Sequence, residues 1–303
     1  MPHRRPRLAD ATAAAVLRGA LVAETERLCE LDAGVRAGDP AAIHRTRVAA
    51  RRLRSHLRTF APLLEPEWPS SAFAELRPFA LSLGRVRDLD VVLALVSADA
   101  SDLRPVADPF VADLELRRSA AMEALRAHIS DHAHSAMLAR LRAAAGEPVL
   151  TGAAQRPARA LLPPLARAAW RRLRRRANAL SAGSDDVTLH EVRVRAKRAR
   201  YASELAADAV AADRGRRRAV SELADRLAGI QGILGTLQDA VTARNEILMA
   251  AARRPADGPF NIAAGMLLER QAARARASRA ELPLAWRALR GRHLAAALRA
   301  PDA

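Results

Sequence analysis

The stretch IHRTRVAARRLRSHLR (residues 43–58) decides the fold class, and a related stretch, LHEVRVRAKRARY (residues 189–201), occurs 146 residues later. On a helix of about 100° per residue, the basic side chains of the first stretch fall within an arc of about 80°. This arc consists of His44, Arg47, Arg51, Arg54 and Arg58, with Arg52 beside it. The opposite arc carries the side chains expected in a core, namely Thr46, Ala49, Ala50, Leu53, Leu57 and Phe60. The pattern therefore predicts an amphipathic helix with a basic face.

Helical periodicity extends along nearly the whole chain, since apolar residues recur at spacings of three and four residues and runs of β-branched residues are rare. Glycine and proline clusters mark the helix ends. The sequence predicts an all-α fold with helices at about 8–37, 40–63, 70–98, 106–130, 134–145, 158–181, 187–212, 215–252, 260–280 and 284–299. Residues 146–157 are the expected linker between an N-terminal half (8–145) and a C-terminal half (158–300).

The two halves resemble each other at three landmarks in the same order. The quoted stretches are offset by 146 residues, LGRVRDLD (83–90) and LGTLQDAV (234–241) by 151, and Pro109-Phe110 and Pro259-Phe260 by 150. Such a long period is typical of a duplicated domain rather than a solenoid. We therefore expect two helical bundles that dock face to face.

The charge of the chain is strongly unbalanced. Its 303 residues include 50 basic and 33 acidic side chains, for a net charge of +17, and Lys197 is the only lysine. This excess indicates a polyanionic partner. Aromatic residues make up only 3% of the chain, and proteins that bind single-stranded nucleic acids usually stack bases on aromatic rings. The composition thus favours a partner that carries phosphates without bases.

The basic face of residues 43–58 points to the same chemistry. Six arginines lie between Arg45 and Arg58 without an acidic residue among them, and like charges at this spacing destabilise an isolated helix. The planar guanidinium group donates paired hydrogen bonds to phosphate oxygens, so a bound polyanion would offset the repulsion. The second stretch repeats the pattern less purely, with Glu191 and Glu204 at the positions of Arg45 and Arg58. Its basic residues are His190, Arg193, Lys197 and Arg200 on one arc, with Arg198 beside it.

Further charged residues allow two interpretations each. The arginine-rich segment 167–176 forms either a wall of the same groove or a solvated surface. Asp88 and Asp239, each four residues after a repeated glycine, either orient these guanidinium groups or form salt bridges between helices. Arg87 is a further candidate phosphate contact, although Gln238 replaces it in the second half.

The sequence predicts neither a metal site nor catalysis. His44 and His190 have no second metal ligand at helical spacing, and the group His128, Asp131, His132 and His134 has no counterpart in the second half. Phosphate-binding glycine loops and nucleophile motifs do not occur, nor do carboxylates grouped to hold Mg²⁺. We therefore expect no cofactor. The single cysteine, Cys29, fits a reducing compartment, and no apolar run is long enough to cross a membrane.

The two quoted stretches, the segments LGRVRDLD and LGTLQDAV and the repeat together resemble the CHAD family, the conserved histidine α-helical domain, over about residues 8 to 300. The resemblance implies two pseudo-symmetric four-helix bundles around a basic groove or pore. It also implies binding of inorganic polyphosphate and an association with polyphosphate granules in the cytoplasm of bacteria. The positions that carry over are His44, Arg47, Arg51, Arg52, Arg54, His190, Arg193, Lys197, Arg198 and Arg200. Glu191, Glu204 and Gln238 depart from the family's pattern.

We therefore expect a stand-alone, non-catalytic polyphosphate-binding module, with Arg58 and Arg87 as additional contacts. The ExExK-type strand motif of the triphosphatase domain that often accompanies this family does not occur. A basic helical nucleic-acid-binding protein is the main alternative. An enzyme that acts on polyphosphate or triphosphate is a second one, disfavoured by the lack of a carboxylate cluster.

Overall fold

A computed structural model describes residues 11–68, 74, 76–130, 132–181 and 183–299 of the chain. The fold is all-α, as predicted: across these residues only two isolated β-bridges accompany the helices. The helices of the first half are α1 (Ala13–Ala37), α2 (Pro40–Thr59), α4 (Leu76–Asp99), α5 (Asp108–Ser130) and α6 (His132–Gly146). Those of the second half are α7 (Ala158–Asn178), α8 (Asp186–Ala209), α9 (Arg214–Ala252), α10 (Gly258–Ala288) and α11 (Arg292–Ala296).

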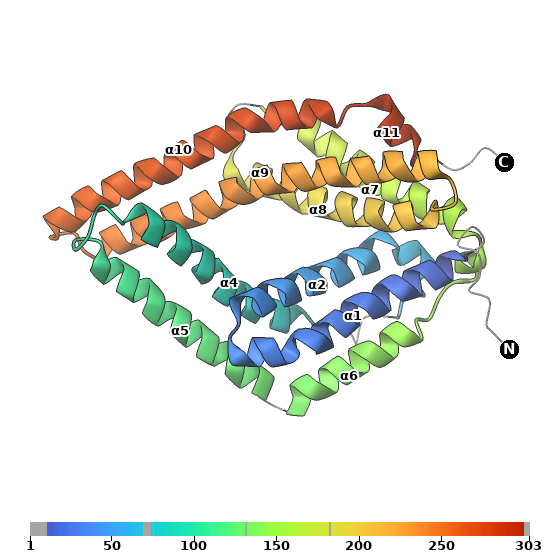
Figure 1. Ribbon diagram of the computed structural model, residues 1–303, viewed down its shortest axis with the longest axis horizontal. Helices are drawn as coiled ribbons and strands as arrows, with labels where there is room; N and C mark the ends of the chain where they lie inside the picture. The colour runs from blue at the N-terminus through green and yellow to red at the C-terminus, as the bar shows by residue number, and fades with distance from the viewer. Residues whose placement is uncertain (1–10, 69–73, 75, 131, 182, 300–303) are drawn as a thin grey trace.

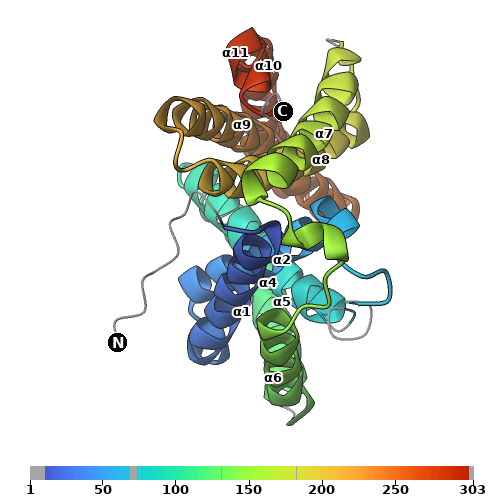
Figure 2. The same ribbon diagram turned by 90° about the vertical axis from the view of Figure 1, so that its right-hand side faces the viewer.

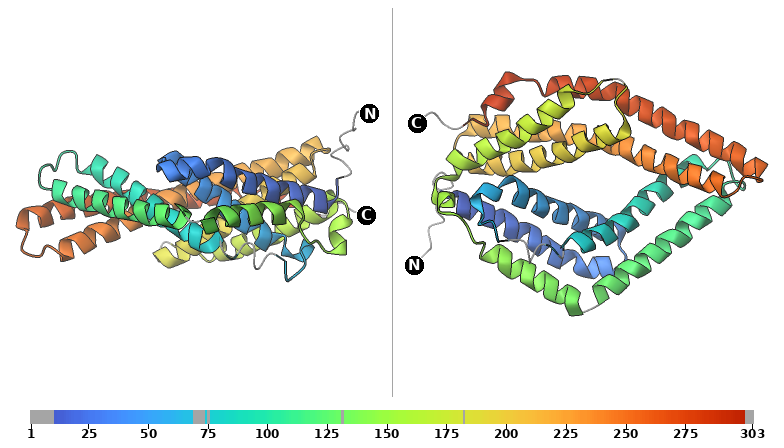
Figure 3. Two further views of the ribbon diagram at one scale, coloured as in Figure 1. Left: turned by 90° about the horizontal axis from the view of Figure 1, so that it is seen from below. Right: turned by 180° about the vertical axis from the view of Figure 1, so that it is seen from behind.

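The molecule is elongated and flat (Figures 1 and 3). Helices α1 to α6 form one side and α7 to α11 the other, and the end-on view shows one side stacked on the other (Figure 2). Helices α2 and α8, which contain the two quoted stretches, lie where the two sides meet, and the tips of the α4–α5 and α9–α10 hairpins meet at the far end (Figure 1). None of the described helices combines the length and hydropathy that a membrane span needs.

The tight turn between α1 and α2 follows from its sequence. Gly38 ends α1 in the left-handed conformation, with φ of 80°, which residues with a Cβ rarely adopt. Asp39 then caps α2, because its carboxylate accepts the backbone N–H groups of Ala41 and Ala42 at 2.9 and 3.1 Å. Pro40 occupies the first position of α2, where no backbone donor is needed. These residues fix the antiparallel α1–α2 pair.

The predicted core face of α2 is confirmed. All six of its residues are buried, and the five apolar ones join a large core to which α1 and α4 to α10 also contribute. A second, smaller core lies at the far end, between α4, α5, α9 and α10. There the repeated phenylalanines Phe110 and Phe260 pack edge to face, with ring centroids 5.9 Å apart. Helices α4, α5, α9 and α10 contribute to both cores and so connect them.

Most predicted helix ends differ from the observed ones by a few residues, and two differences change whole segments; the starts predicted at residues 8 and 70 lie outside the described residues. Helix α10 continues through Pro283 to Ala288, whereas the sequence predicted a break there. Proline removes one backbone hydrogen bond, but the buried Leu282 and Trp286 on either side hold the helix against the core. The helix predicted over 40–63 ends at Thr59 and is followed by a short 3₁₀ turn, η2 (Ala61–Leu63).

The predicted linker connects α6 to α7, and although most of its side chains are exposed, Ala154 is buried. The linker contains a 3₁₀ turn, η3 (Gly152–Gln155), and pairs with the first half through backbone hydrogen bonds from Glu65 to Val149 and from Thr151 to Leu63, at 3.0 and 3.1 Å. The division of the chain into two halves at this segment, and their origin by duplication, stay predictions.

Candidate functional site

A basic cavity of about 450 Å³ lies between α2, α4 and α8, and we call it the central groove. The predicted site residues that line it are Arg47, Arg51, Arg54, Arg58, His190, Arg193, Lys197 and Arg198. The basic stripes of α2 and α8, 146 residues apart in the sequence, therefore face one cavity. Among the described lining residues, seven arginines and one lysine stand against a single carboxylate, that of Asp88.

Neighbouring helices hold two of the α2 arginines in place. Arg47 Nη1 donates to Asp88 Oδ1 of α4 at 3.0 Å, so Asp88 forms a salt bridge between helices, which is one of the two roles expected for it. Arg51 Nε donates to the Tyr201 hydroxyl of α8 at 3.2 Å. Both guanidinium groups keep further N–H donors for a ligand, because each has five.

Two polar side-chain atoms of the central groove are buried without a hydrogen-bond partner among the described residues. They are Arg193 Nε of α8 and Ser55 Oγ of α2. Burial lowers the pKa of Arg193, an effect that Asp239 opposes and that Arg51 and Arg47 reinforce. A buried cation without a hydrogen-bonded counter-charge is costly. An anion in the central groove would offset that cost.

Lys197 is the most perturbed cation in the central groove. Its burial, together with the positive charges of Arg193, Arg51 and Arg47, lowers its pKa to about 7, and only Asp239 opposes the shift. Burial raises the pKa of Asp239 in turn, against the influence of Arg193. Burial first, and the neighbouring arginines second, therefore leave the Lys197 amine incompletely protonated at neutral pH.

Four predicted site residues do not line the central groove, and their binding role stays a prediction. His44 and Arg52 line a separate cavity on the α1 side, where Arg52 contacts Glu24 at 3.7 Å. Arg52 also bonds to Glu204 at 2.9 Å, and Arg200 bonds to the same carboxylate at 2.7 Å. Glu204, which departs from the predicted stripe, thus ties two basic residues together across the two halves.

The remaining residue of the four, Arg87, lies on α4 within electrostatic reach of His44. Burial lowers the pKa of His44, and Arg87, Arg51 and Arg47 add to this effect. In the second half Gln238 takes the place of Arg87, and its Oε1 accepts a hydrogen bond from His190 Nδ1 at 2.9 Å. The substitution therefore gives His190 a neutral partner in place of a cation.

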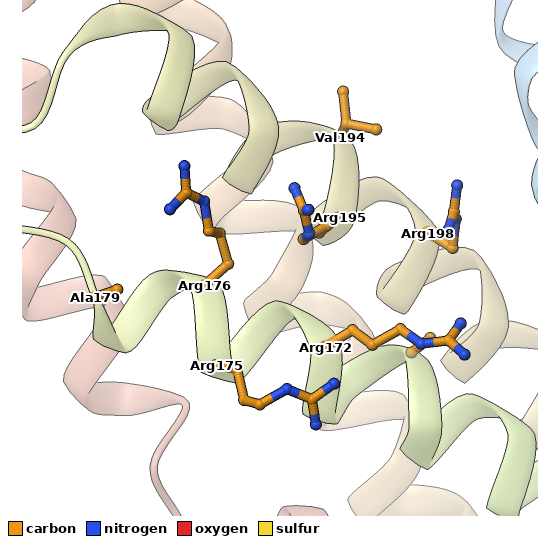
Figure 4. A pocket seen from close by; sticks show the side chains of 8 residues that line it. Arg172, Arg175, Arg176, Ala179, Val194, Arg195 and Arg198 are labelled. Carbon is orange, nitrogen blue, oxygen red and sulfur yellow. The ribbon is translucent and has the colours of Figure 1, made fainter.

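The arginine-rich segment before the second stretch divides between two environments. Arg172, Arg175 and Arg176 line a second cavity of about 730 Å³ between α7 and α8, which we call the outer pocket (Figure 4). It shares Val194 and Arg198 with the central groove. Arg171 and Arg174 lie exposed on α7 outside both cavities. Part of the segment therefore extends the basic surface, and part is a solvated face.

Two of the three neighbouring histidines, His128 and His134, contact the ring of Phe79. His134 is buried, with Nε2 2.8 Å from Asp32 Oδ1. Asp131 lies outside the described residues. Among the residues that are described, no three His, Cys, Asp or Glu side chains come together as metal ligands.

Among the polar lining residues, sequence reasoning missed Arg85 and Tyr201. Tyr201 lies eleven residues after His190 and therefore on the same helical arc, a signal that was available. Arg85 could be identified as a lining residue only from the orientation of α4 relative to α2.

Comparisons with known proteins agree with this architecture. The family model described as CHAD domain matches residues 19–248. Two uncharacterized proteins of Mycobacterium tuberculosis, from two strains, are 28% identical over 283 residues, which is 88% of this chain and 51% of theirs. The chain thus spans about half the length of the curated relatives it matches.

Two solved structures have the same fold. PptA from Streptomyces chartreusis is 25% identical, with a TM-score of 0.74 over 91% of this chain and 99% of that one. The CHAD domain from the plant Ricinus communis is 23% identical, with a TM-score of 0.72 over 95% of this chain and 98% of that one.

Proposed function

Because the chain belongs to the CHAD family, we propose that it binds inorganic polyphosphate, without catalysis, in the central groove. The observation that carries the proposal is the convergence of two basic helix faces on one cavity. Arginines on successive helical turns are about 5.4 Å apart along the axis. Such a ladder suits a flexible, linear anion whose charged groups repeat along its length.

The side chains of the central groove favour phosphate over nucleic acid bases. Tyr201 is the one aromatic residue among its described lining residues. Its hydroxyl accepts a hydrogen bond from Arg51, and the guanidinium of Arg52 lies 4.9 Å from the centre of its ring. This ring is therefore already in contact with the protein, whereas base recognition needs free aromatic faces.

Charge reversal in the central groove tests the proposal. We expect Arg47/Arg51/Arg54→Glu to abolish binding of long-chain polyphosphate at fixed salt. The matched control is Arg214/Arg217/Arg218→Glu, which makes the same change in net charge at exposed residues of α9. Unchanged affinity in the groove variant, or equal loss in both variants, would refute the assignment of the site.

Salt dependence and competition distinguish the proposal from its alternatives. By analogy with DNA, about 6–10 phosphate contacts predict a loss of roughly 10³–10⁵ in affinity between 50 and 200 mM salt. DNA or RNA that displaces polyphosphate at equal phosphate concentration would favour a nucleic-acid-binding protein. Metal-dependent release of phosphate by the purified protein would favour an enzyme.

The proposal also predicts a location. We expect the protein in the cytoplasm at polyphosphate granules, because these granules concentrate its ligand. A fluorescent fusion of the wild type should coincide with granules, whereas the same fusion of the groove variant should be diffuse. Equal distributions of the two would contradict this expectation.

A further inference from the structure

The outer pocket between α7 and α8 adjoins the central groove, with which it shares two lining residues. Arg198 and Val194 of α8 line both cavities. In Figure 4 the side chains of Arg172 and Arg198 reach the same end of the outer pocket from different helices, while Arg176 lies at the other end. The outer pocket extends from Ala169 to Ala179 along α7, which is about 15 Å of helix.

The charges of the outer pocket resemble those of the central groove. Among its described lining residues are five arginines and no acidic side chain. The nearby Glu191 accepts hydrogen bonds from Arg176 Nε at 2.9 Å and Arg195 Nη1 at 3.1 Å, and so holds these two side chains in place. Arg172 and Arg175 are exposed and form no ion pair with any described residue. Their guanidinium groups are free to bind an anion.

Arg198 connects the two sets of charges. Burial is the main cause of its lowered pKa, and Arg58 of the central groove and Arg172 of the outer pocket both contribute. Both arginines therefore lie within electrostatic reach of Arg198. Positive charge continues from one cavity to the other without an intervening acid among the lining residues.

We propose that the outer pocket is a second binding segment for the same linear polyanion, which leaves the central groove past Arg198 and continues between α7 and α8. The inference rests on the proposed function and adds a preference for chain length. A short anion fills the central groove alone, whereas a long one contacts both cavities. Once a long chain is bound in the central groove, its contact with the outer pocket is intramolecular. The high effective concentration of the chain at the outer pocket then raises the overall affinity.

The test uses two ligands and two double variants of the full chain. Arg172/Arg175→Glu changes the outer pocket, and Arg171/Arg174→Glu makes the same charge change on the same helix outside it. Affinities for tripolyphosphate and for long-chain polyphosphate are measured by titration calorimetry over a range of salt concentrations. Circular dichroism verifies that both variants fold.

We expect Arg172/Arg175→Glu to weaken long-chain binding about tenfold relative to the control variant. It should also reduce the slope of log K against log salt by about 2, which corresponds to two lost phosphate contacts. Tripolyphosphate affinity should be equal in the two variants. Equal long-chain affinities, or a matching loss for tripolyphosphate, would overturn the second segment while leaving the central groove intact. Failure of the wild type to bind either ligand would instead overturn the proposed function, and the second segment with it.

Discussion

Replacing Lys197 with arginine tests the electrostatics of the central groove through pH. In the free protein, burial and the cations Arg193, Arg51 and Arg47 lower the pKa of Lys197 to about 7, against the opposing charge of Asp239. A bound polyanion adds negative charge beside the amine and raises this pKa, so binding takes up a proton. Affinity is therefore highest below pH 7 and falls as the pH rises through 7.

The size of the effect follows from the fraction of Lys197 that is protonated. A group with a pKa of about 7 is about 90% protonated at pH 6 and about 10% at pH 8. If the bound amine stays charged throughout, affinity falls about tenfold between these pH values, or about 1.4 kcal/mol. Binding at pH 7 takes up about half a proton per site.

Calorimetry in two buffers with different ionisation enthalpies measures the proton uptake, and titrations at pH 6 and 8 measure the affinity ratio. Arginine stays charged at both pH values. The affinity of Lys197→Arg should therefore lack the part of the pH dependence that comes from Lys197, and the variant should bind more tightly than the wild type at pH 8. The variant keeps Asp239, so the comparison cancels the titration of that carboxyl group. The same pH ratio in both proteins would refute the reasoning.

Three further substitutions probe the scaffold, each by urea denaturation against the wild type. Phe110→Ala should destabilise the protein by about 3–5 kcal/mol, because it leaves a cavity beside Phe260 in the smaller core; a change below about 1 kcal/mol would contradict this packing. Asp99→Ala should cost about 1–3 kcal/mol, since Arg274 loses its bond to the Asp99 carboxylate. Burial opposes ionisation of Asp99, but the hydrogen bonds and charges of Arg274, Gln271 and Arg270 together outweigh it and lower the pKa. The wild type should therefore lose this stability as the pH falls through the lowered pKa, and the variant should not. Gly38→Ala should cost about 1–2 kcal/mol, because φ is 80° there; an unchanged midpoint would argue against that conformation.

The helices could be predicted because their signals are local. The end of α1 and the start of α2 follow from Gly38, Asp39 and Pro40, which act within one turn. The basic face of α2 follows from helical geometry alone. Pro283 misled the prediction because its local cost is offset by the packing of Trp286 against Trp170 of α7, with ring centroids 5.7 Å apart, and such a contact depends on tertiary structure.

The candidate site was predicted less completely, since a charge pattern does not reveal its partners. Arg51 and Arg52 are neighbours on one helix, yet Arg51 lines the central groove and Arg52 bonds to Glu204 of α8. Glu191 looked like a defect in the basic stripe but holds two arginines near the outer pocket. Which arginines remain free is decided by the packing of α2, α7 and α8 against one another. That packing depends on contacts between residues far apart in the sequence.

The lowered pKa of Lys197 has a consequence for chemical reactivity. A lysine amine reacts with electrophiles only when it is unprotonated, and desolvation makes it a better nucleophile near neutral pH. Lys197 is the only lysine of the chain, and its pKa is about 7. An amine-directed reagent at neutral pH therefore has one side chain to modify, and that side chain lies in the wall of the central groove. Lys197 is thus the one side-chain amine to which a fluorophore or cross-linker can be attached, and occupancy of the groove should slow its labelling, unlike that of an α-amino group.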